Sequence, residues 1–286
     1  MKNKLFLMLI PLVTLPGCKE AAKSYGVYDS DNNKISNGYG AFLGRYENNT
    51  KGFNDYEYIS LEADEYQQST LKKLTNDGKK IFAYLNVGSL EEYRPYYNQF
   101  KDITFKDYEN WDDERWIDVS NIDWQNCIIN IAKSFSEMGF YGVYMDNVDV
   151  YSVLKEDGIL KTDHINGLKN IITGVQNLNL KVMVNGGAEF FDDMMDQQNN
   201  VLDKVWGYHQ EEVFTLIDDY DNDVFTKQDK EDSSYYKEIA NKMQNLGKEI
   251  FFLEYKNSDW SKKNEIDEYC TSKGYHYYIS KTVDLI

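Results

Sequence analysis

The chain has 286 residues, with 48 acidic side chains against 31 basic ones and a formal net charge of −17. Nucleic acids and anionic membrane surfaces repel so acidic a protein, so the charge argues against both as partners and favours a neutral or cationic substrate. With only Cys127 and Cys270 beyond Cys18, the chain is also not a disulfide-rich scaffold.

The first predicted element is a leader, MKNKLFLMLIPLVTLPGC, in which two lysines precede the apolar run Leu5–Leu15. The run is too short to span a bilayer as a helix and is typical of a signal peptide. LPGC resembles the lipobox of bacterial lipoproteins, from which Pro16 departs, and makes Cys18 the expected lipidation site. We therefore expect a cleaved signal peptide at residues 1–17 and an N-terminal tether at residues 18–38. The alternative is an ordinary secretory signal with an incidental cysteine.

From residue 39 onward, short apolar runs alternate with segments of helical periodicity that end at a glycine or asparagine. Helices alternating with short apolar strands indicate βαβ units and a parallel sheet. The expected strands lie near residues 40, 57, 82, 142, 182, 205, 251 and 277. Eight strands with helices between them predict an α/β fold, a (β/α)8 TIM-type barrel formed as a single domain by residues 39–286. Counting alone leaves an open doubly wound sheet as the alternative.

The helix expected before the strand near 142 contains the first internal cysteine. Trp124, Cys127, Ile128 and Phe135 recur there at helical spacing, so these side chains should face the core. A buried free thiol is favoured at Cys127 over a disulfide with Cys270.

The segment between the strands near 82 and 142 begins with a long region of little periodicity. Residues 88–125 are rich in aromatic and charged side chains and contain Pro95, the one proline beyond the leader. Such a region is typical of an elaborate βα loop over one face of a barrel, where loops carry function.

Acidic and amide side chains follow the expected strands at the points where these strands end. In a (β/α)8 barrel these ends converge on the active site. The acids are Glu62, Asp64, Asp146, Glu211, Glu212 and Glu254, and the amides are Asn86 and Asn185. Burying several carboxylates together costs free energy unless they are paired or used, so the set indicates acid/base chemistry on a neutral substrate. For any one acid, a helix N-cap or a solvated loop position is an equally good interpretation.

Other chemistries find little support in the sequence. The three histidines are scattered, and H-E-x-x-H, C-x-x-C, G-x-S-x-G and P-loop motifs are absent from the sequence. We therefore expect no metal site and no cofactor. Loop aromatics are abundant instead: Tyr93, Tyr96, Tyr97, Tyr108, Trp111, Trp116 and Trp124. Two carboxylates walled by aromatic rings, which pack on sugar faces, are the layout of a glycoside hydrolase.

Five blocks of the sequence resemble glycoside hydrolase family 114, the endo-α-1,4-polygalactosaminidases and their relatives. The blocks are FAYLNVGSLEEYRPYY, ERWIDVSN, GFYGVYMDNVDVY, VMVNGG and YHQEEVF. The first and third are fairly specific together, and the resemblance covers most of the chain from about residue 39. It implies a (β/α)8 barrel that cleaves α-1,4-linked galactosamine or N-acetylgalactosamine exopolysaccharide, endo-acting and retaining, with no cofactor.

The resemblance also implies roles for individual residues. Asp146 falls on the family's nucleophile and Glu211 on its acid/base, with the adjacent Glu212 as the open alternative. Further positions on the family blocks, expected to line subsites, are Tyr84, Arg94, Asp118, Asn147, Asp149 and Asn185. Glu212, Glu254 and Asp64 are added to the substrate-binding set from their places at strand ends, with Glu254 and Asp64 next in line for the acid.

The sequence therefore predicts a monomeric extracellular glycoside hydrolase at the outer face of a bacterial cell membrane, lipid-anchored or secreted. Its partner is a galactosamine-containing polysaccharide, and it contacts the membrane only through the lipid anchor. A non-catalytic cell-surface glycan-binding lipoprotein is the first alternative. A transporter's solute-binding component is the second, although such proteins have two lobes and this chain keeps one helix–strand rhythm.

Overall fold

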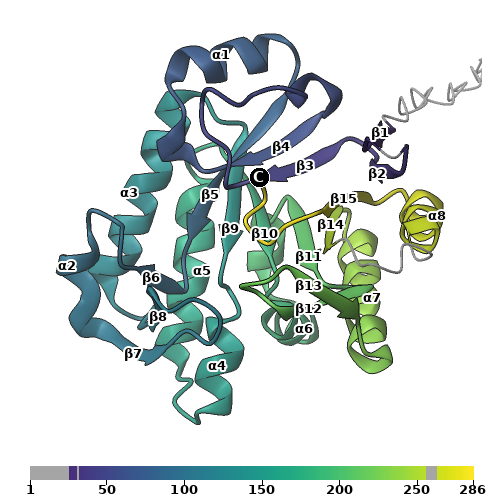
Figure 1. Ribbon diagram of the computed structural model, residues 1–286. Helices are drawn as coiled ribbons and strands as arrows, with labels where there is room; N and C mark the ends of the chain where they lie inside the picture. The colour runs from purple at the N-terminus through teal and green to yellow at the C-terminus, as the bar shows by residue number, and fades with distance from the viewer. Residues whose placement is uncertain (1–25, 31, 256–262) are drawn as a thin grey trace, which may run out of the picture.

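Eight parallel strands form the centre of the computed structural model, which describes residues 26–30, 32–255 and 263–286 (Figure 1). The expected signal peptide at 1–17 and the lipidation site Cys18 lie outside these residues. Neighbouring strands pair in chain order. The strands are β3 (Tyr39–Phe42), β4 (Tyr58–Leu61), β5 (Lys80–Asn86), β9 (Gly142–Asp146), β10 (Lys181–Asn185), β11 (Gly207–Glu211), β14 (Glu249–Tyr255) and β15 (His276–Ser280).

All eight expected strands are present, and one of them starts later than the sequence predicts. A strand was expected over residues 203–209, whereas β11 begins at Gly207. Residues Asn200–Lys204 instead form the 3-10 helix η4, whose start is capped by the Asn199 side chain accepting the Val201 amide hydrogen. The cap satisfies a backbone donor that a strand would have used, so the extended chain begins only after the helix.

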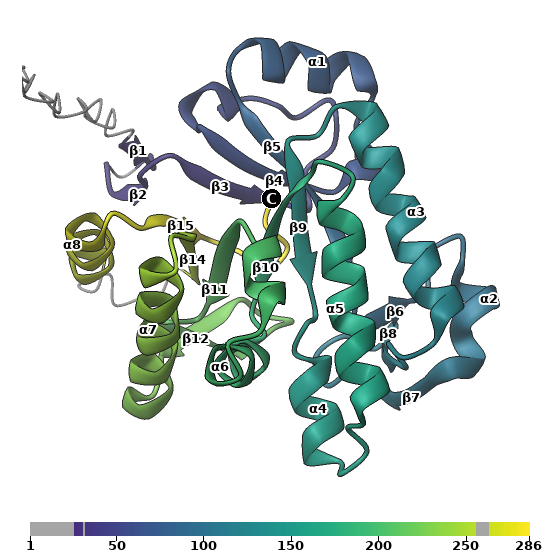
Figure 2. The same ribbon diagram turned by 180° about the vertical axis from the view of Figure 1, so that it is seen from behind.

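The sheet curls until its last parallel strand, β15, lies beside its first, β3 (Figures 1 and 2). Among the described residues, no hydrogen-bonded ladder joins β15 to β3. At this seam β15 pairs instead with β2 (Lys34–Ser36), which pairs antiparallel with β1 (Val27–Tyr28). The chain is thus a single α/β domain built on a curled sheet, and the closure expected of an eightfold barrel is not shown. The expected tether region contains β1 and β2.

Helices cover the outer face of the curled sheet (Figure 2). They are α1 (Gln68–Asn76), α3 (Ile122–Met138), α4 (Val150–Glu156), α5 (Thr162–Gln176), α6 (Ala188–Asp196), α7 (Lys230–Asn245) and α8 (Lys263–Lys273). Within residues 43–57, which connect β3 to β4, the structure has only the 3-10 helix η1 (Phe53–Asp55). That connection is rich in Asn and Gly, which favour turns over helix, so the βα repeat lacks one outer helix there.

Helix α3 illustrates how the sequence sets these boundaries. The Asn121 side chain accepts the amide hydrogens of Asp123 and Trp124 at the start, and Gly139 ends the helix with a φ of 97°. Trp124, Ile128 and Phe135 are buried as predicted. Cys127 is half-buried, Cys270 is buried, and both are free thiols.

Two insertions lie at the carboxyl ends of the strands. After β5, residues 88–117 form a three-stranded sheet and two short helices where an irregular loop was expected. Its elements are β6 (Ser89–Glu91), α2 (Tyr97–Phe100), η3 (Lys101–Ile103), β7 (Thr104–Asp107) and β8 (Glu114–Ile117). After β11, β12 (Thr215–Asp219) and β13 (Val224–Lys227) form a hairpin. A 3-10 turn, η2 (Ala63–Glu65), follows β4.

Aromatic rings fill the interior of the curled sheet. Phe82 stacks on Trp206 with ring centroids 5.4 Å apart, and Tyr39 meets Phe251 edge-on at 5.1 Å. Phe82, Tyr39 and Phe251 are buried, and with the partly buried Trp206 they form a packed floor, so any ligand site lies above them at the strand ends. In the described part of the chain, we find no helix with the length and apolar character needed to cross a bilayer.

Candidate active site

A cleft of about 830 Å³ opens at the carboxyl ends of the parallel strands. Its lining includes ten carboxylate side chains, and no lysine or arginine belongs to the lining formed by the described residues. The acids are Glu62, Glu65, Glu91, Asp113, Glu114, Asp146, Asp149, Glu211, Glu212 and Asp284. Eight aromatic side chains share the lining: Tyr46, Tyr84, Tyr93, Tyr108, Trp111, Tyr220, Tyr236 and Tyr255. The cleft therefore combines strong negative charge with flat apolar surfaces.

Asp146 and Glu211 face each other across the amide of Asn185. The Asn185 Nδ2 group donates to Asp146 Oδ1 at 2.9 Å and to Glu211 Oε1 at 2.7 Å. The two carboxylate oxygens are therefore separated by no more than the sum of these lengths, about 5.6 Å. The three side chains are the last residues of the adjacent strands β9, β10 and β11.

The backbone turns away from the sheet in the same way after each of these three residues. Asn147, Gly186 and Glu212 have φ angles of 62°, 64° and 58°, in the left-handed region. Glycine and asparagine adopt this region at little cost, whereas glutamate is rarely found there. The turn ends each strand directly after Asp146, Asn185 or Glu211, so that side chain stands at the rim of the sheet.

Both central carboxyl groups hold their protons more tightly than usual. Burial, reinforced by the charge of Glu211, raises the pKa of Asp146 to about 6, although N–H groups of Asn185 and Asn147 oppose the shift. Burial likewise raises the pKa of Glu211, with the Glu212 charge adding to it and the Tyr255, Asn185 and Tyr144 hydrogen bonds opposing it. Two close acids with raised pKa values are suited to general acid and nucleophile roles near neutral pH.

Three further side chains that hold this pair were not predicted. Tyr144 on β9 donates to Glu211 Oε1 at 3.1 Å, and Tyr255 on β14 donates a short hydrogen bond to Glu211 Oε2. His209, on β11, contacts Asn185 through its Nδ1 atom at 2.7 Å. Tyr144 lies two residues before Asp146, and His209 lies two residues before Glu211. Side chains two apart on a strand share a face, so this spacing was the signal available in the sequence.

Glu212 lines the same cleft but has different contacts. Its Oε1 accepts the Ile217 backbone amide hydrogen at 2.6 Å, and burial raises its pKa. The left-handed backbone at Glu212 turns its side chain toward the β12–β13 hairpin. The structure therefore places Glu211, and not Glu212, beside Asp146.

Asn147 belongs to a second polar cluster, which connects the strand ends to the β6–β8 sheet. Its Nδ2 lies 2.9 Å from Glu114 Oε1 and 3.1 Å from Asn86 Oδ1. Asn86 donates to the same Glu114 oxygen at 2.7 Å, and Ser89 also donates to it. Burial raises the pKa of Glu114 to about 7. Glu114 was not predicted, because it comes from the insertion and not from a strand of the main sheet.

Asp149 and Tyr84 also line the cleft, as expected. Asp149 accepts the Gly187 amide hydrogen at 2.8 Å, and burial raises its pKa to about 6. Tyr84 lies on β5, where burial raises its pKa well above the usual value, with the charges of Glu91 and Asp146 adding to the effect. Asp149 thus fastens the β9 turn to the β10 turn.

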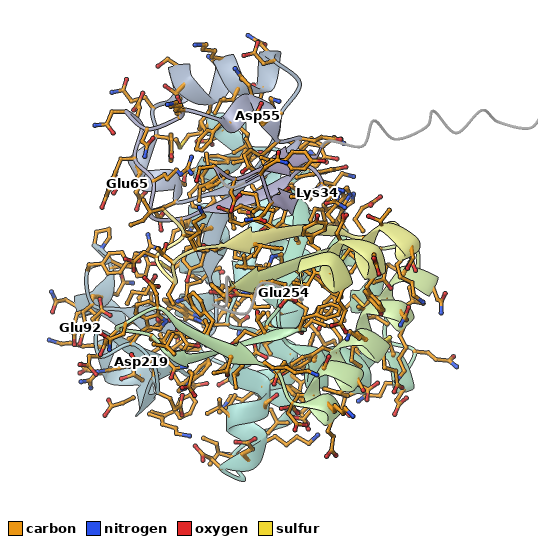
Figure 3. The ribbon with its side chains drawn as sticks, turned by 45° about the vertical axis from the view of Figure 1, so that its right-hand side comes forward. Lys34, Asp55, Glu65, Glu92, Asp219 and Glu254 are labelled. Carbon is orange, nitrogen blue, oxygen red and sulfur yellow. The ribbon has the colours of Figure 1, made fainter. Side chains whose placement is uncertain are left out.

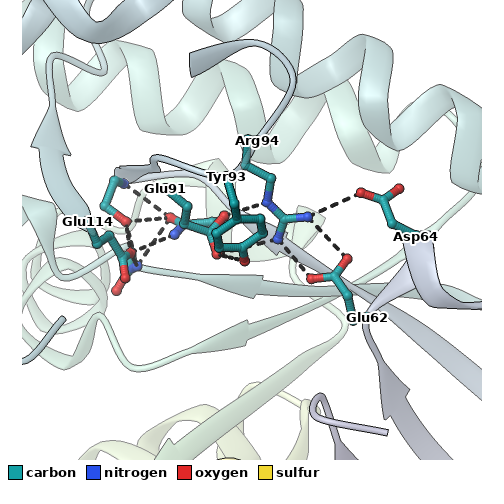
Figure 4. A network of polar contacts seen from close by, with 9 residues as sticks. Glu62, Asp64, Glu91, Tyr93, Arg94 and Glu114 are labelled. Atoms are coloured by element: carbon teal, nitrogen blue, oxygen red, sulfur yellow. Dashed lines mark hydrogen bonds and ion pairs between the residues drawn. The ribbon is translucent and has the colours of Figure 1, made fainter. Parts of the chain in front are cut away.

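Arg94 lies at the edge of the cleft in a network of acids (Figure 4). Its guanidinium contacts Glu62 at 2.8 Å, Glu91 at 2.6 Å and Asp64 at 3.3 Å. Arg94 is not among the residues that line the cleft, and neither is Asp64, whose side chain is 69% exposed. Arg94 therefore neutralises neighbouring acids, of which Glu62 and Glu91 do line the cleft.

The remaining two expected site residues lie outside the cleft lining. Asp118 precedes α3, where it accepts the amide hydrogen and hydroxyl of Ser120 and lies 3.3 Å from His164 Nε2. Glu254 is fully buried within the body of the molecule (Figure 3) and accepts the backbone amides of Val213, Phe214 and Thr215. On β14 it alternates with Tyr255, which faces the cleft, so Glu254 points away from it. Among the described residues, no cluster of three or more His, Cys, Asp or Glu is arranged to hold a metal ion.

Comparison with known proteins identifies the family of the chain. The family model described as glycoside-hydrolase family GH114 matches residues 41–285, which confirms the resemblance of the sequence blocks. The chain is 24% identical over 261 residues to the uncharacterized protein MJ1477 of Methanocaldococcus jannaschii, covering 80% of this chain and 68% of that one. It is 22% identical over 169 residues to an uncharacterized protein of Thermotoga maritima, covering 56% of this chain and about half, 52%, of that protein.

Two solved structures share the fold. The glycoside hydrolase domain of PelA from Pseudomonas aeruginosa superposes with a TM-score of 0.71 at 15% identity, covering 87% of this chain and 96% of that one. Ega3 from Aspergillus fumigatus, in complex with galactosamine, superposes with a TM-score of 0.67 at 19% identity, covering 87% and 92%. At these identities the likeness establishes the arrangement of strands and helices.

Proposed function

Because the chain belongs to glycoside hydrolase family GH114, we propose that it cleaves galactosamine-containing polysaccharide between Asp146 and Glu211. The observation that carries the proposal is the pair of carboxyl groups bridged by one amide, within a cleft lined by acids and aromatic rings. Two carboxyl groups that flank a glycosidic bond are the catalytic machinery of most glycoside hydrolases.

The spacing of the pair supports a retaining mechanism. Retaining enzymes hold their two carboxyl groups about 5–5.5 Å apart, whereas inverting enzymes need about 6.5–9.5 Å to admit a water molecule. The limit of about 5.6 Å between Asp146 Oδ1 and Glu211 Oε1 fits the first range. The Asn185 Nδ2 group already bridges these two oxygens.

The proposed roles follow from the surroundings of each acid. Asp146 Oδ1 is held by two N–H donors, so we assign the attack on the anomeric carbon to Oδ2. Glu211 gives its proton to the leaving oxygen as the bond to the sugar breaks. In the second step Glu211 takes a proton from water, and the water oxygen displaces Asp146. The hydrogen bonds of Asn185 stabilise each carboxylate while it carries charge.

The lining of the cleft supports a cationic substrate. Ten carboxylates surround the site, and Arg94 is already paired with three of the nearby acids. A polymer with free amino groups brings ammonium charges that such a cleft attracts, whereas an anionic glycan is repelled. Tyr46, Tyr93 and Trp111 are exposed at the cleft and offer ring faces to successive sugars. A solved structure with the same fold, Ega3, contains galactosamine.

Linkage, endo action and location belong to the same proposal. The substrate is an α-1,4-linked galactosamine or N-acetylgalactosamine exopolysaccharide, cut within the chain. Acylation at Cys18, outside the described residues, would hold the enzyme at the outer face of the cell membrane, among such polymers. The mass of the N-terminal residue of the mature protein tests that location.

Hydrolysis of defined polymers tests the proposed function. The protein is incubated with α-1,4-galactosamine polymer, free or N-acetylated, and reducing ends are followed over time, with Asp146→Asn as the matched variant. We expect release by the wild type and a loss of several orders of magnitude in the variant, because the nucleophile is removed. Early products of mixed length indicate endo action, and the first-formed anomer by NMR tests retention.

Each unfavourable outcome points to a different part of the proposal. Binding of the polymers by the wild type with no release of reducing ends would favour the non-catalytic glycan-binding alternative. Near-wild-type turnover by Asp146→Asn would remove Asp146 from the nucleophile role and leave the substrate assignment standing.

A further inference from the structure

The orientation of one amide group determines the electrostatics of the whole site. Asn185 presents its NH2 group to both Asp146 and Glu211. If the amide rotated by half a turn, its carbonyl oxygen would face the two carboxyl groups. Both acids would then lose a donor and gain a repulsive partner. We therefore looked for a group that holds the Asn185 amide with its NH2 group facing the two acids.

His209 contacts the opposite side of this amide. Its Nδ1 lies 2.7 Å from Asn185 Oδ1, an atom that can only accept, so the imidazole must donate. The ring is fully buried and lies edge-on to Tyr144 and Tyr39, with centroids 4.9 and 5.4 Å away. These rings fix its plane. The Tyr144 hydroxyl lies 3.4 Å from the same nitrogen and 3.1 Å from Glu211 Oε1, to which it donates.

We propose that His209 is a positioning residue, whose Nδ1–H holds the Asn185 amide so that it donates to Asp146 and Glu211 together. This assignment rests on the proposed roles of the two acids. It adds that one tautomer of His209 holds the amide that donates to both of them. The imidazole touches neither the substrate nor the reacting atoms, because the cleft lining does not include it.

The other ring nitrogen explains why one tautomer is held. His209 Nε2 is buried and has no hydrogen-bond partner within the part of the chain that the structure describes. A proton on Nε2 would be a buried donor without an acceptor, whereas the proton on Nδ1 is used. The doubly protonated ring would bury an unpaired charge, and burial accordingly lowers the pKa of His209 to about 3. The ring is therefore neutral across the range in which the two acids titrate.

If His209 holds the Asn185 amide, the loss of this contact should change the pH dependence of the rate. The titratable groups that face His209 or the acid pair are Tyr39 on β3, Tyr84 on β5, Tyr144 on β9 and Tyr255 on β14, besides Asp146, Glu211 and Glu212. Tyr108, Glu114 and Asp149 also interact electrostatically with Asp146. The tyrosines ionise only well above neutral pH, because burial raises their pKa values. Releasing the Asn185 amide removes a donor from each acid, so the pKa of Asp146 should rise. The acidic limb of the rate profile should then move to higher pH.

Nitrogen NMR of the imidazole rings tests the tautomer without any substrate. The chain has three histidines, which keeps the spectrum simple. We expect His209 to show the Nδ1–H tautomer and no titration above about pH 4, given the lowered pKa. His164 is an internal reference of the opposite type, because its Nδ1 accepts the Lys161 amide hydrogen. An Nε2–H tautomer at His209, or titration near pH 6.5, would overturn the proposal.

Kinetics of matched variants test the positioning role. In His209→Asn the side-chain NH2 lies close to the place of Nδ1 and can donate to Asn185, whereas His209→Leu cannot. We expect His209→Leu to lower kcat by about 10–100-fold with little change in KM, and to shift the acidic limb upward. His209→Asn should restore most of kcat and the wild-type limb. Phe251→Leu, a buried ring in the same interior, should lower Tm but leave the limb in place.

A double variant separates positioning from packing. If His209 acts through Asn185, then His209→Leu combined with Asn185→Ala should cost little more kcat than Asn185→Ala alone. Fully additive losses, or a limb that moves equally in Phe251→Leu, would show a structural role and overturn the proposal. If the wild type cleaves none of the polymers, the proposed function fails, whereas the NMR result still decides the tautomer.

Discussion

Glu211 and Glu212 are adjacent in the chain, yet the structure gives them different surroundings. Glu211 receives hydrogen bonds from Asn185, Tyr144 and Tyr255. Glu212 receives one from the Ile217 backbone, and its charge helps to raise the pKa of Glu211. The sequence left open which of the two donates the proton, because a strand end predicts a position and not a side-chain direction. The left-handed turn at Glu212 determines that direction.

The pH profiles of Glu211→Gln and Glu212→Gln should therefore differ. Glu211 must be protonated to act, so its raised pKa sets the basic limb, and Glu211→Gln should abolish that limb. The same change removes a charge that raises the pKa of Asp146, so the acidic limb near pH 6 should move lower. Activity on poor leaving groups should fall far more than on an activated aryl glycoside.

Glu212→Gln is the matched variant for this measurement. Removing its charge should lower the pKa of Glu211, so the basic limb should remain but move to lower pH, and KM should rise. If Glu212→Gln removes the basic limb and Glu211→Gln keeps it, the two roles are reversed.

The structure brings together three residues that the sequence singled out. Asp146, Asn185 and Glu211 were found because each directly follows an apolar run, and parallel strands bring their ends to one edge. His209 was missed because it lies inside a strand, where a side chain is taken as packing. Tyr255, the last residue of β14, was missed because only acids and amides were considered at the strand ends. Glu114 was missed because its position depends on how an insertion folds back over the sheet.

At the scale of elements, β14 shows how one strand supports another's loop. The carboxyl group of Glu254 accepts backbone hydrogens from Val213, Phe214 and Thr215, and also the Thr215 hydroxyl. These residues directly follow Glu211 and Glu212. Glu254, expected to bind substrate, instead fastens the loop between β11 and the β12–β13 hairpin. Strand alternation sends it to the outer face, which a count of strand-end acids could not reveal.

Glu254→Gln should destabilise the protein measurably. All four donors point at the carboxyl group, and an amide NH2 in its place leaves at least one buried donor facing another, at a cost of about 1–3 kcal/mol. We expect Tm to fall by several degrees in thermal unfolding. Glu249→Gln, at the other end of β14 and half exposed, should change Tm little. Equal Tm values in the two variants would contradict this role for Glu254.

The pH dependence of the same variant has a defined sign. Burial raises the pKa of Glu254 to about 8, above the value of an unfolded glutamate. A raised carboxyl pKa contributes stability that is greatest below the unfolded value and is lost as pH rises toward the folded one. The destabilisation caused by Glu254→Gln should therefore be larger at pH 5 than at pH 8.

For the whole molecule, the eight strands and their order follow from the sequence. Each apolar run is bounded by turn residues, and the segment after it brings the chain back to the start of the next parallel strand. The sequence did not predict the missing helix between β3 and β4 or the seam occupied by β2. Counting strands cannot tell a closed barrel from a curled sheet, since closure depends on how β15 and β3 approach one another. The net charge of −17 favoured a cationic substrate only in a general sense, and the acidic lining of the cleft gives that charge a location.

Substrate binding should therefore depend on salt in a way that reveals the charge of the polymer. Added NaCl shortens the screening length from about 10 Å at 0.1 M to about 3 Å at 1 M. KM for the free-amine polymer should rise over this range, while kcat at saturation stays constant. The N-acetylated polymer is the control, and its KM should barely change. Equal responses of the two polymers would contradict recognition of ammonium groups by the cleft.

The path of the N-terminal segment has a consequence for how the enzyme meets its polymer. Strands β1 and β2 join the sheet beside the amino end of β3 (Figure 1), whereas the cleft lies at the carboxyl ends of the strands. A support attached close to Val27 would therefore lie at the opposite end of the sheet from the mouth of the cleft. A protein immobilised close to Val27 on a bead or sensor chip would present its cleft away from the surface. It could therefore cleave an insoluble polysaccharide film while it stays attached to its support.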